Sequence, residues 1–64
     1  MSTYETPSVG SVYLFSHEQR YHWMPACFVV LKIYKYSKLM NILTSEGKFD
    51  SMFYDSIIDK YEKL

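Results

Sequence analysis

Short stretches of the chain place residues of like character on alternate positions, a period of two that is typical of β-strands. The first stretch, residues 9–15, puts Val12 and Leu14 on one face and Tyr13 and Phe15 on the other. The preceding residues 1–8 are mostly polar and predict an extended arm. The following residues 16–25 are polar and then aromatic, and they end at a proline, which predicts a long loop.

Residues 26–34 are the strongest strand candidate because they are rich in β-branched and aromatic side chains. The orientation of this strand is inferred from Lys32, whose charged group is expected to face water. Side chains alternate along a strand, so Phe28 and Val30 are predicted to share the solvent face with Lys32. The core face would then carry Cys27, Val29, Leu31 and Ile33.

Residues 39–54 predict a β-hairpin. After a connection at residues 35–38, residues 39–44 form a strand with Met40 and Ile42 pointing inward and Asn41 outward. The clearest turn signal follows at residues 45–48, where Gly47 can adopt the positive φ that a short hairpin requires. Residues 49–54 are the strand after this turn.

The last ten residues support two different predictions. Ile57, Ile58, Tyr61 and Leu64 recur at helical spacing behind a capping residue, which favours a short helix. Alternatively, residues 55–58 make a single helical turn and residues 59–64 form a final strand that closes the sheet. A segment of this length does not decide between them.

Four or five short strands, joined by tight turns and one long early loop, predict an all-β fold: a small, strongly bent antiparallel barrel. A chain of 64 residues has room for one compact domain, which we assign to residues 9–64 after the arm at residues 1–8. Its residues are 48% hydrophobic and 19% aromatic, well above a disordered tail, so this domain is expected to fold.

The chain resembles Src-homology-3-like small barrels in four segments, which are residues 7–15, the run 28–34, the Leu43–Lys48 turn and the corner at residues 54–57. Within that class the chain is similar to the Tudor- or KOW-like forms found as short uncharacterised bacteriophage proteins. The resemblance implies an antiparallel barrel and an accessory or structural role. Signalling members bind proline-rich peptides through an acidic, tyrosine-bearing first loop and a tryptophan pair. Neither occurs in residues 16–25, so the fold carries over better than that activity.

Seven basic and seven acidic residues give a formal net charge of 0, which provides no long-range field for a phosphate backbone or an anionic membrane. Weak nucleic-acid binding through Lys32, Lys35 and Lys38, with aromatic stacking, is therefore the alternative function and not the favoured one. The simpler interpretation of these lysines is a solvated rim that keeps sheet edges from associating.

No catalytic site, metal site or cofactor is predicted. His17, His22 and Cys27 lie at five-residue spacings, but structural zinc sites use closely spaced ligand pairs. A Cys–His nucleophilic pair would lack an orienting third group and an oxyanion hole. A single cysteine, with no leader-like or membrane-spanning segment, favours the cytoplasm, or the virion if the protein is phage-encoded.

Tyr21, His22 and Trp23 form an aromatic cluster on the predicted long loop, where binding residues are common. Tyr54, at the corner after the hairpin, is predicted to approach this cluster. In the alternative interpretation, Trp23 folds over the open end of the barrel as a lid.

The predicted barrel also has more apolar side chains than its interior can hold. The surplus on the outward face would be Phe28, Val30, Leu39, Leu43 and Met52. We therefore predict a non-enzymatic protein-binding module that uses the Phe28 and Val30 face together with the aromatic loop. Its partner is expected to be another protein or a second copy of the chain.

Overall fold

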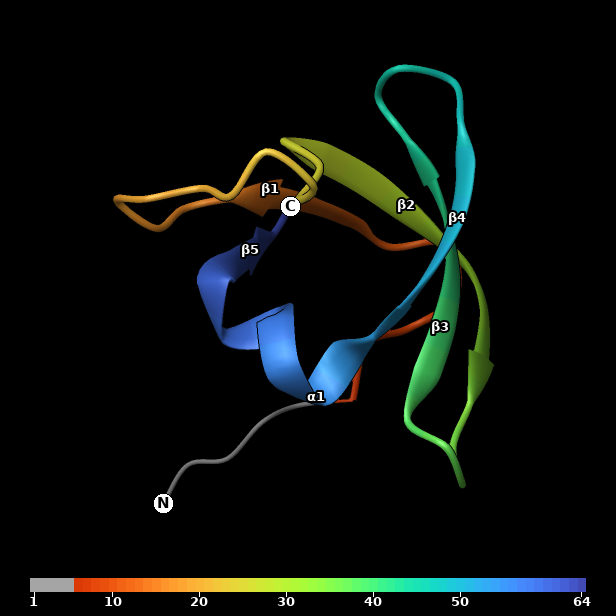
Figure 1. Cartoon of the computed structure of the whole chain (residues 1–64). Coiled ribbons are helices and arrows are strands. Elements are labelled where there is room, and N and C mark those ends of the chain that lie inside the picture. Colours follow the sequence, from red (N-terminus) through yellow and green to blue (C-terminus); the bar gives the residue numbers. More distant parts are fainter. Residues whose placement is uncertain (1–5) are drawn as a thin grey trace.

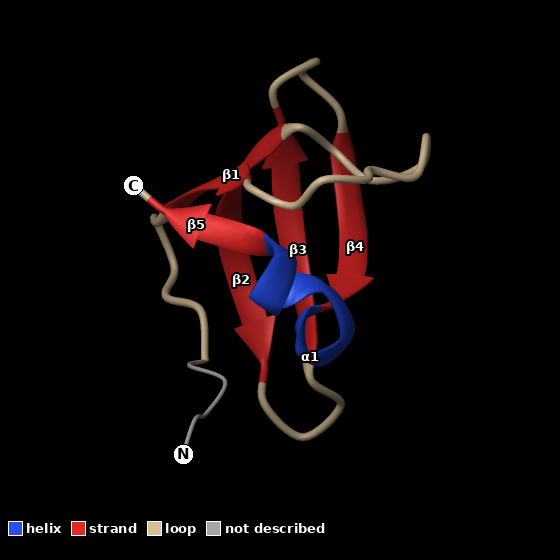
Figure 2. Cartoon of the chain, turned by 90° about the vertical axis from the view of Figure 1, so that its left-hand side faces the viewer, coloured by secondary structure: helices blue, strands red, loops and turns tan. Residues whose placement is uncertain are grey.

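The computed structural model of the chain describes residues 6–64, which form a five-stranded antiparallel sheet and a short helical segment (Figures 1 and 2). The elements in chain order are β1 (Val12–Phe15), β2 (Cys27–Tyr34), β3 (Leu39–Thr44), β4 (Phe49–Phe53), α1 (Tyr54–Ile57), the 3-10 turn η1 (Ile58–Lys60) and β5 (Tyr61–Lys63).

The strands lie in the order β4-β3-β2-β1-β5, so each of the first four pairs with its neighbour in sequence. The helical segment then carries the chain back across the sheet, and β5 pairs with β1 through Tyr13↔Lys63 and Phe15↔Tyr61. β4 and β5 are the two edges, and the sheet is not closed between them. The all-β prediction is confirmed as an open, curved antiparallel sheet with a short helix.

The core lies on the concave side of this sheet, where the helical segment covers it (Figure 1). Phe28 is at its centre, with its ring stacked on Tyr13 at a centroid distance of 5.5 Å and edge-on to Tyr61 at 4.9 Å. Each strand and both helical turns contribute to the core, as does the loop before β2. The buried residues are Tyr13, Met24, Phe28, Val30, Met40, Ile42, Met52, Tyr54, Ile57, Ile58 and Tyr61.

The predicted orientation of β2 is wrong for the residues before Lys32 and correct for Lys32, which is exposed, and Ile33, which packs against the core. Phe28 and Val30 are each only 1% exposed, whereas Leu31, predicted to face the core, is exposed. The cause is a β-bulge: Val30 pairs with Ile42 and Lys32 with Asn41, so Leu31 is an extra residue without a partner on β3. Lys32 does face outward. Because the bulge interrupts the alternation of side chains, the orientation of Lys32 does not predict the orientation of Val30.

Within the β3–β4 hairpin, the inward positions of Met40 and Ile42 are confirmed. The predicted outward position of Met52 is wrong, because Met52 pairs with Met40 and shares its buried face. Leu39 and Leu43 are half-buried on the opposite face.

The predicted turns at residues 35–38 and 45–48 are confirmed. Gly47 has φ +83°, as expected, and its N–H donates to Thr44 O at 2.9 Å. Of the predicted arm, residues 1–5 lie outside the described residues; residues 6–8 form no helix or strand, and Pro7 is buried.

The structure favours the second C-terminal prediction, a tight helical turn followed by a final strand, but that strand is an edge of the sheet and does not close it. α1 and η1 together reverse the chain and bury Tyr54, Ile57 and Ile58, and β5 then adds to β1. The continuous helix suggested by the spacing of Ile57, Ile58, Tyr61 and Leu64 does not form, because pairing with β1 satisfies the main chain of residues 61–63.

Candidate functional site: the cleft beside Trp23

The loop at residues 16–25 is held in place by hydrogen bonds at its C-terminal end. Arg20 Nη1 donates to Met24 O at 2.8 Å, Met24 N donates to Tyr21 O at 2.9 Å, and Tyr61 Oη donates to Pro25 O. Met24 is 2% exposed and inserts into the core. The position of its neighbour Trp23 is thereby fixed by the fold.

The Tyr61 phenol gives this anchor a measurable pH dependence. Burial raises the pKa of Tyr61 from 10.0 to about 12, and the nearby Arg20 guanidinium offsets part of that rise. Because the folded chain holds this proton more tightly than the unfolded chain, the contribution is complete below about pH 10 and is lost as the pH rises toward about 12. Between pH 10 and about pH 12, we expect the urea midpoint of the Tyr61→Phe variant to decrease less with pH than the midpoint of the wild type. An unchanged profile in the variant would show that the phenol does not couple to folding.

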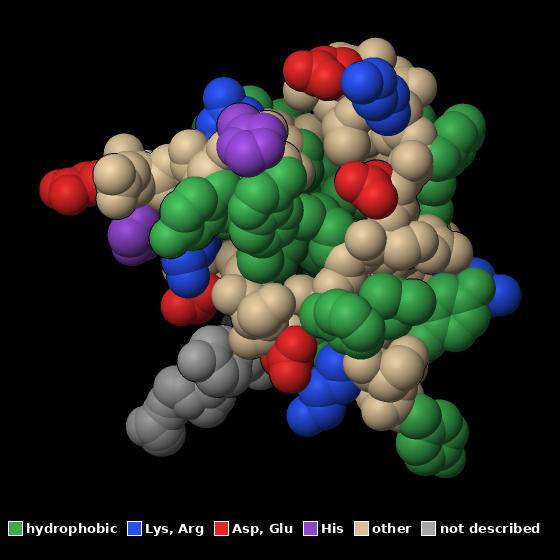
Figure 3. Space-filling model, in the orientation of Figure 1, with side chains coloured by type: hydrophobic (Ala, Val, Ile, Leu, Met, Phe, Trp, Pro, Cys, Tyr) green, Lys and Arg blue, Asp and Glu red, His purple; other side chains and the backbone are tan. Residues whose placement is uncertain are grey.

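Trp23 is the most prominent side chain of the loop. It is 54% exposed, and its indole stacks on Tyr21 with a centroid distance of 6.0 Å and an interplanar angle of 4°. Trp23 does not insert into the interior, which Met24, a flexible unbranched side chain suited to core gaps, occupies instead. Trp23 and Tyr21 present an aromatic surface to solvent, with exposed His22 between them in sequence. Figure 3 shows hydrophobic side chains at the surface on this side of the molecule, next to a histidine.

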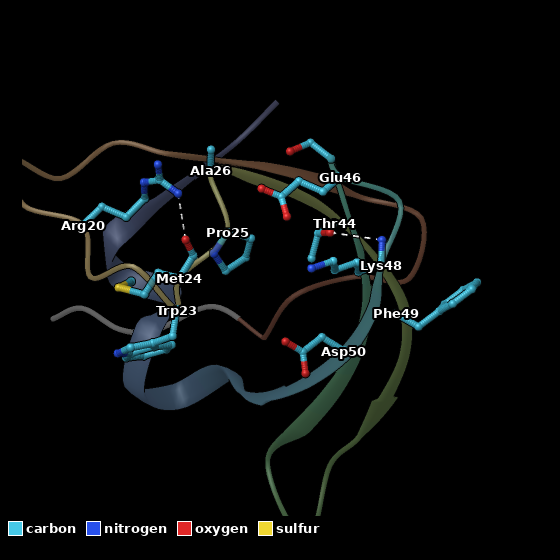
Figure 4. A pocket seen from close by; sticks show the side chains of 11 residues that line it. Arg20, Trp23, Met24, Pro25, Ala26, Thr44, Glu46, Lys48, Phe49 and Asp50 are labelled. Atoms are coloured by element: carbon cyan, nitrogen blue, oxygen red, sulfur yellow. Dashed lines mark hydrogen bonds between the residues drawn. The ribbon is translucent and has the colours of Figure 1, made fainter.

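Two adjoining hollows meet at Trp23. One, of about 430 Å³, lies between the loop and the β3–β4 hairpin (Figure 4), and the other, of about 300 Å³, lies between Trp23 and the junction of β4 with α1. Trp23 and Asp50 line both, and Figure 4 shows them on opposite sides of the opening while Phe49 points away from it. We refer to the two hollows together as the Trp23 cleft.

The charges along the Trp23 cleft are balanced. Arg20 and Lys48 supply positive charge, and Glu46 and Asp50 supply negative charge. Within residues 6–64 the only ion pair joins Lys60 and Asp59, so none of these four groups is neutralised by another across the cleft. The Trp23 cleft is lined by an aromatic ring, by apolar side chains and by charges of both signs that form no ion pairs with one another. Such a lining suits a polypeptide better than a uniformly anionic ligand.

Several predicted site residues lie elsewhere. Phe28 and Val30 are core residues, so the proposed contact face through them does not exist in the folded chain. Tyr54 is also buried and does not join the aromatic cluster. The outward placement of Phe28 and Val30 assumed an unbroken alternation in β2, which the bulge interrupts. The exposure of Tyr54 assumed that the corner after β4 leaves its first residue in solvent, but α1 turns Tyr54 into the core.

The lysines of the alternative function lie away from the cleft. Lys35 and Lys38 are exposed in the β2–β3 turn, at the other end of β3 from the β3–β4 turn that borders the cleft. Lys32 is on the outer face of β2, with Nζ 5.0 Å from the centre of the Tyr34 ring. Across the described part of the chain, no three His, Cys, Asp or Glu side chains are grouped to hold a metal ion, and Cys27 is a half-buried free thiol.

Sequence reasoning missed Asp50 and Arg20. Asp50 is directly opposite Ile42 in the sheet, on the inner face, and only this register reveals that a carboxylate opens into the cleft. Arg20 reads as one polar loop residue among several, and its role depends on the carbonyl of Met24.

Comparison of the chain with protein-family models, curated proteins and solved structures finds no match. None of the helices among residues 6–64 has the length and apolar character needed to cross a lipid bilayer.

Proposed function

We propose that this chain is a non-enzymatic protein-binding module built on a small Src-homology-3-like barrel, and that the Trp23 cleft is its binding site. The β1–β4 meander, the helical corner and the return of β5 to β1 support the barrel assignment. The observation that carries the function is the exposed Trp23, held on an anchored loop above a cleft with balanced charges. Tryptophan is strongly enriched among the residues that dominate protein interfaces.

The cleft favours a polypeptide ligand over nucleic acid. A phosphate backbone needs several cations along one surface, but Glu46 and Asp50 lie in the cleft, and the lysine group is at the far end of the hairpin. A peptide can match charges of both signs and can place an apolar side chain against the indole. The protein therefore acts by binding a segment of a partner, as an accessory component of a larger assembly.

Peptides selected from a displayed random library against the folded protein test this proposal. Trp23 is the only tryptophan of the chain, so its fluorescence reports directly on the cleft. We expect a bound peptide to shift the emission to shorter wavelength. The Trp23→Ala variant has no tryptophan, so its affinity and that of the wild type are compared by titration calorimetry, and we expect the substitution to weaken binding by about 30-fold, the equivalent of a 2 kcal/mol contact. Tyr36→Ala removes another exposed aromatic ring, outside the cleft, and should change neither fold nor affinity.

Equal binding by the Trp23→Ala and wild-type proteins would refute the site. Failure to select any peptide, together with oligonucleotide binding that weakens steeply with added salt, would refute the function and favour the lysine surface instead.

A further inference from the structure

β4 is an edge of the sheet, and among residues 6–64 no strand lies beyond it (Figure 2). We propose that the free edge of β4 pairs with β4 of a second copy, antiparallel, about a twofold axis through Ser51. The pairing would join the two sheets into one continuous sheet. It uses the main-chain edge of β4, whereas the Trp23 cleft is lined by side chains of the same strand, among them Ser51 and Phe53.

The main chain of β4 has hydrogen-bonding groups available for such pairing. Thr44 N donates to Lys48 O and Tyr54 N donates to Lys38 O, so even-numbered residues of the strand turn their main-chain groups toward β3. Phe49, Ser51 and Phe53 therefore direct theirs to the free edge. Two of these groups already have local partners. Ser51 N donates to Asp50 Oδ1 at 2.8 Å, a contact that would exchange for an inter-chain bond. Phe53 O accepts from Ser56 Oγ at 3.1 Å and, because Phe53 is the N-cap of α1, also accepts the first main-chain hydrogen bond of that helix, so it is not available for pairing. The inter-chain bonds would therefore run between the two Ser51 residues and from Phe53 N to Phe49 O.

The edge has little of the protection that usually prevents association. Residues 49–53 include neither lysine nor proline, and the one charged residue, Asp50, lines the Trp23 cleft while its Oδ1 accepts from Ser51 N at the edge. Phe49 is 78% exposed and Phe53 is 57% exposed, and both belong to the outer face of the sheet. An edge strand that carries two exposed phenylalanines suits pairing with another strand.

A second copy fits this edge because the strand is nearly symmetrical about its centre. In antiparallel self-pairing centred on Ser51, Phe49 of each copy stands directly opposite Phe53 of the other. The four rings then form two cross-strand aromatic pairs on the outer face, and each Asp50 stands opposite Met52 and not opposite its own counterpart. The formal net charge of 0 removes overall repulsion between the copies.

Two double variants test this register, since both remove the same exposed rings. Phe49→Lys with Phe53→Glu places opposite charges across the pairing, whereas Phe49→Lys with Phe53→Lys places like charges there. By sedimentation equilibrium up to about 1 mM, because interfaces this small are weak, we expect the wild-type mass to rise from monomer toward dimer. The Lys/Glu variant should retain this association, and the Lys/Lys variant should weaken it at least tenfold while keeping the wild-type circular dichroism.

Amide hydrogen exchange in the wild-type protein gives an independent readout that needs no substitution. The Phe53 N–H group, which would donate to Phe49 O of the other copy, should exchange more slowly as protein concentration rises, and the N–H of exposed Tyr36 should not change. A wild-type monomer at every concentration, equal association of the two double variants, or exchange at Phe53 that ignores concentration would each overturn the proposal. Peptide binding at the Trp23 cleft is tested separately by Trp23→Ala, which leaves β4 unchanged.

Discussion

Val30→Asp is expected to unfold the protein. The Val30 side chain is 1% exposed and packs in the core beside Phe28, and no described cation reaches that interior. A buried, unpaired carboxylate either carries a desolvation cost of several kcal/mol or must take up a proton at a comparable cost. Chains of 64 residues typically have a total stability of roughly 3–10 kcal/mol, so one such change consumes most of it.

Leu31→Asp is the matched control, because it introduces the same charge one residue further along. Leu31 lies at the bulge and is 40% exposed, so its carboxylate remains in water. We expect this variant to keep the far-ultraviolet circular dichroism of the wild type, with a thermal midpoint only a few degrees lower. A folded Val30→Asp protein with an unfolded Leu31→Asp protein would mean that the orientation of β2 is the reverse of the one described here.

Local patterns were sufficient to predict the β3–β4 hairpin. Met40 and Ile42 alternate with polar or half-buried neighbours, and Gly47 is one of only two glycines in the chain, so both register and turn follow from nearby residues. The bulge at Leu31 has no such local signal. It arises because β2 must bend while pairing with β1 on one side and β3 on the other, and that requirement is set by residues distant in sequence.

The candidate site was predicted only in part for the same reason. The aromatic loop does expose Tyr21 and Trp23, but the sequence does not show which side chain of this loop enters the core. Tyr61, 36 residues from Pro25, binds the loop so that Met24 and not Trp23 points inward. The position of Asp50 likewise depends on its pairing with Ile42.

The prediction of surplus apolar surface identified the property but not the residues. Phe28, Val30 and Met52 are buried, while Tyr21, Trp23, Phe49 and Phe53 are exposed. Once β2 turns its aromatic side inward, the excess moves to the loop and to the edge strand. The two surfaces share β4, because Ser51 and Phe53 of this edge strand also line the Trp23 cleft.

Phe28→Ala is expected to cause the second-largest loss of stability, about 3–5 kcal/mol. Phe28 is 1% exposed, and its ring is the contact that joins Tyr13 of β1 to Tyr61 of β5. Removing it leaves a cavity between two aromatic rings that are fixed by strand pairing and cannot close the space. Urea denaturation followed by circular dichroism would measure the loss as a lower midpoint.

Phe49→Ala makes the identical chemical change at a ring that is 78% exposed, and it should shift the midpoint by less than about 0.5 kcal/mol. The comparison is made at a protein concentration low enough to keep the chain monomeric, so that pairing through β4 does not contribute. Equal losses in the two variants would mean that Phe28 is not the centre of the core. A loss confined to Phe28→Ala would locate the stabilising aromatic contacts at the junction of β1, β2 and β5, which also carries the loop that presents Trp23.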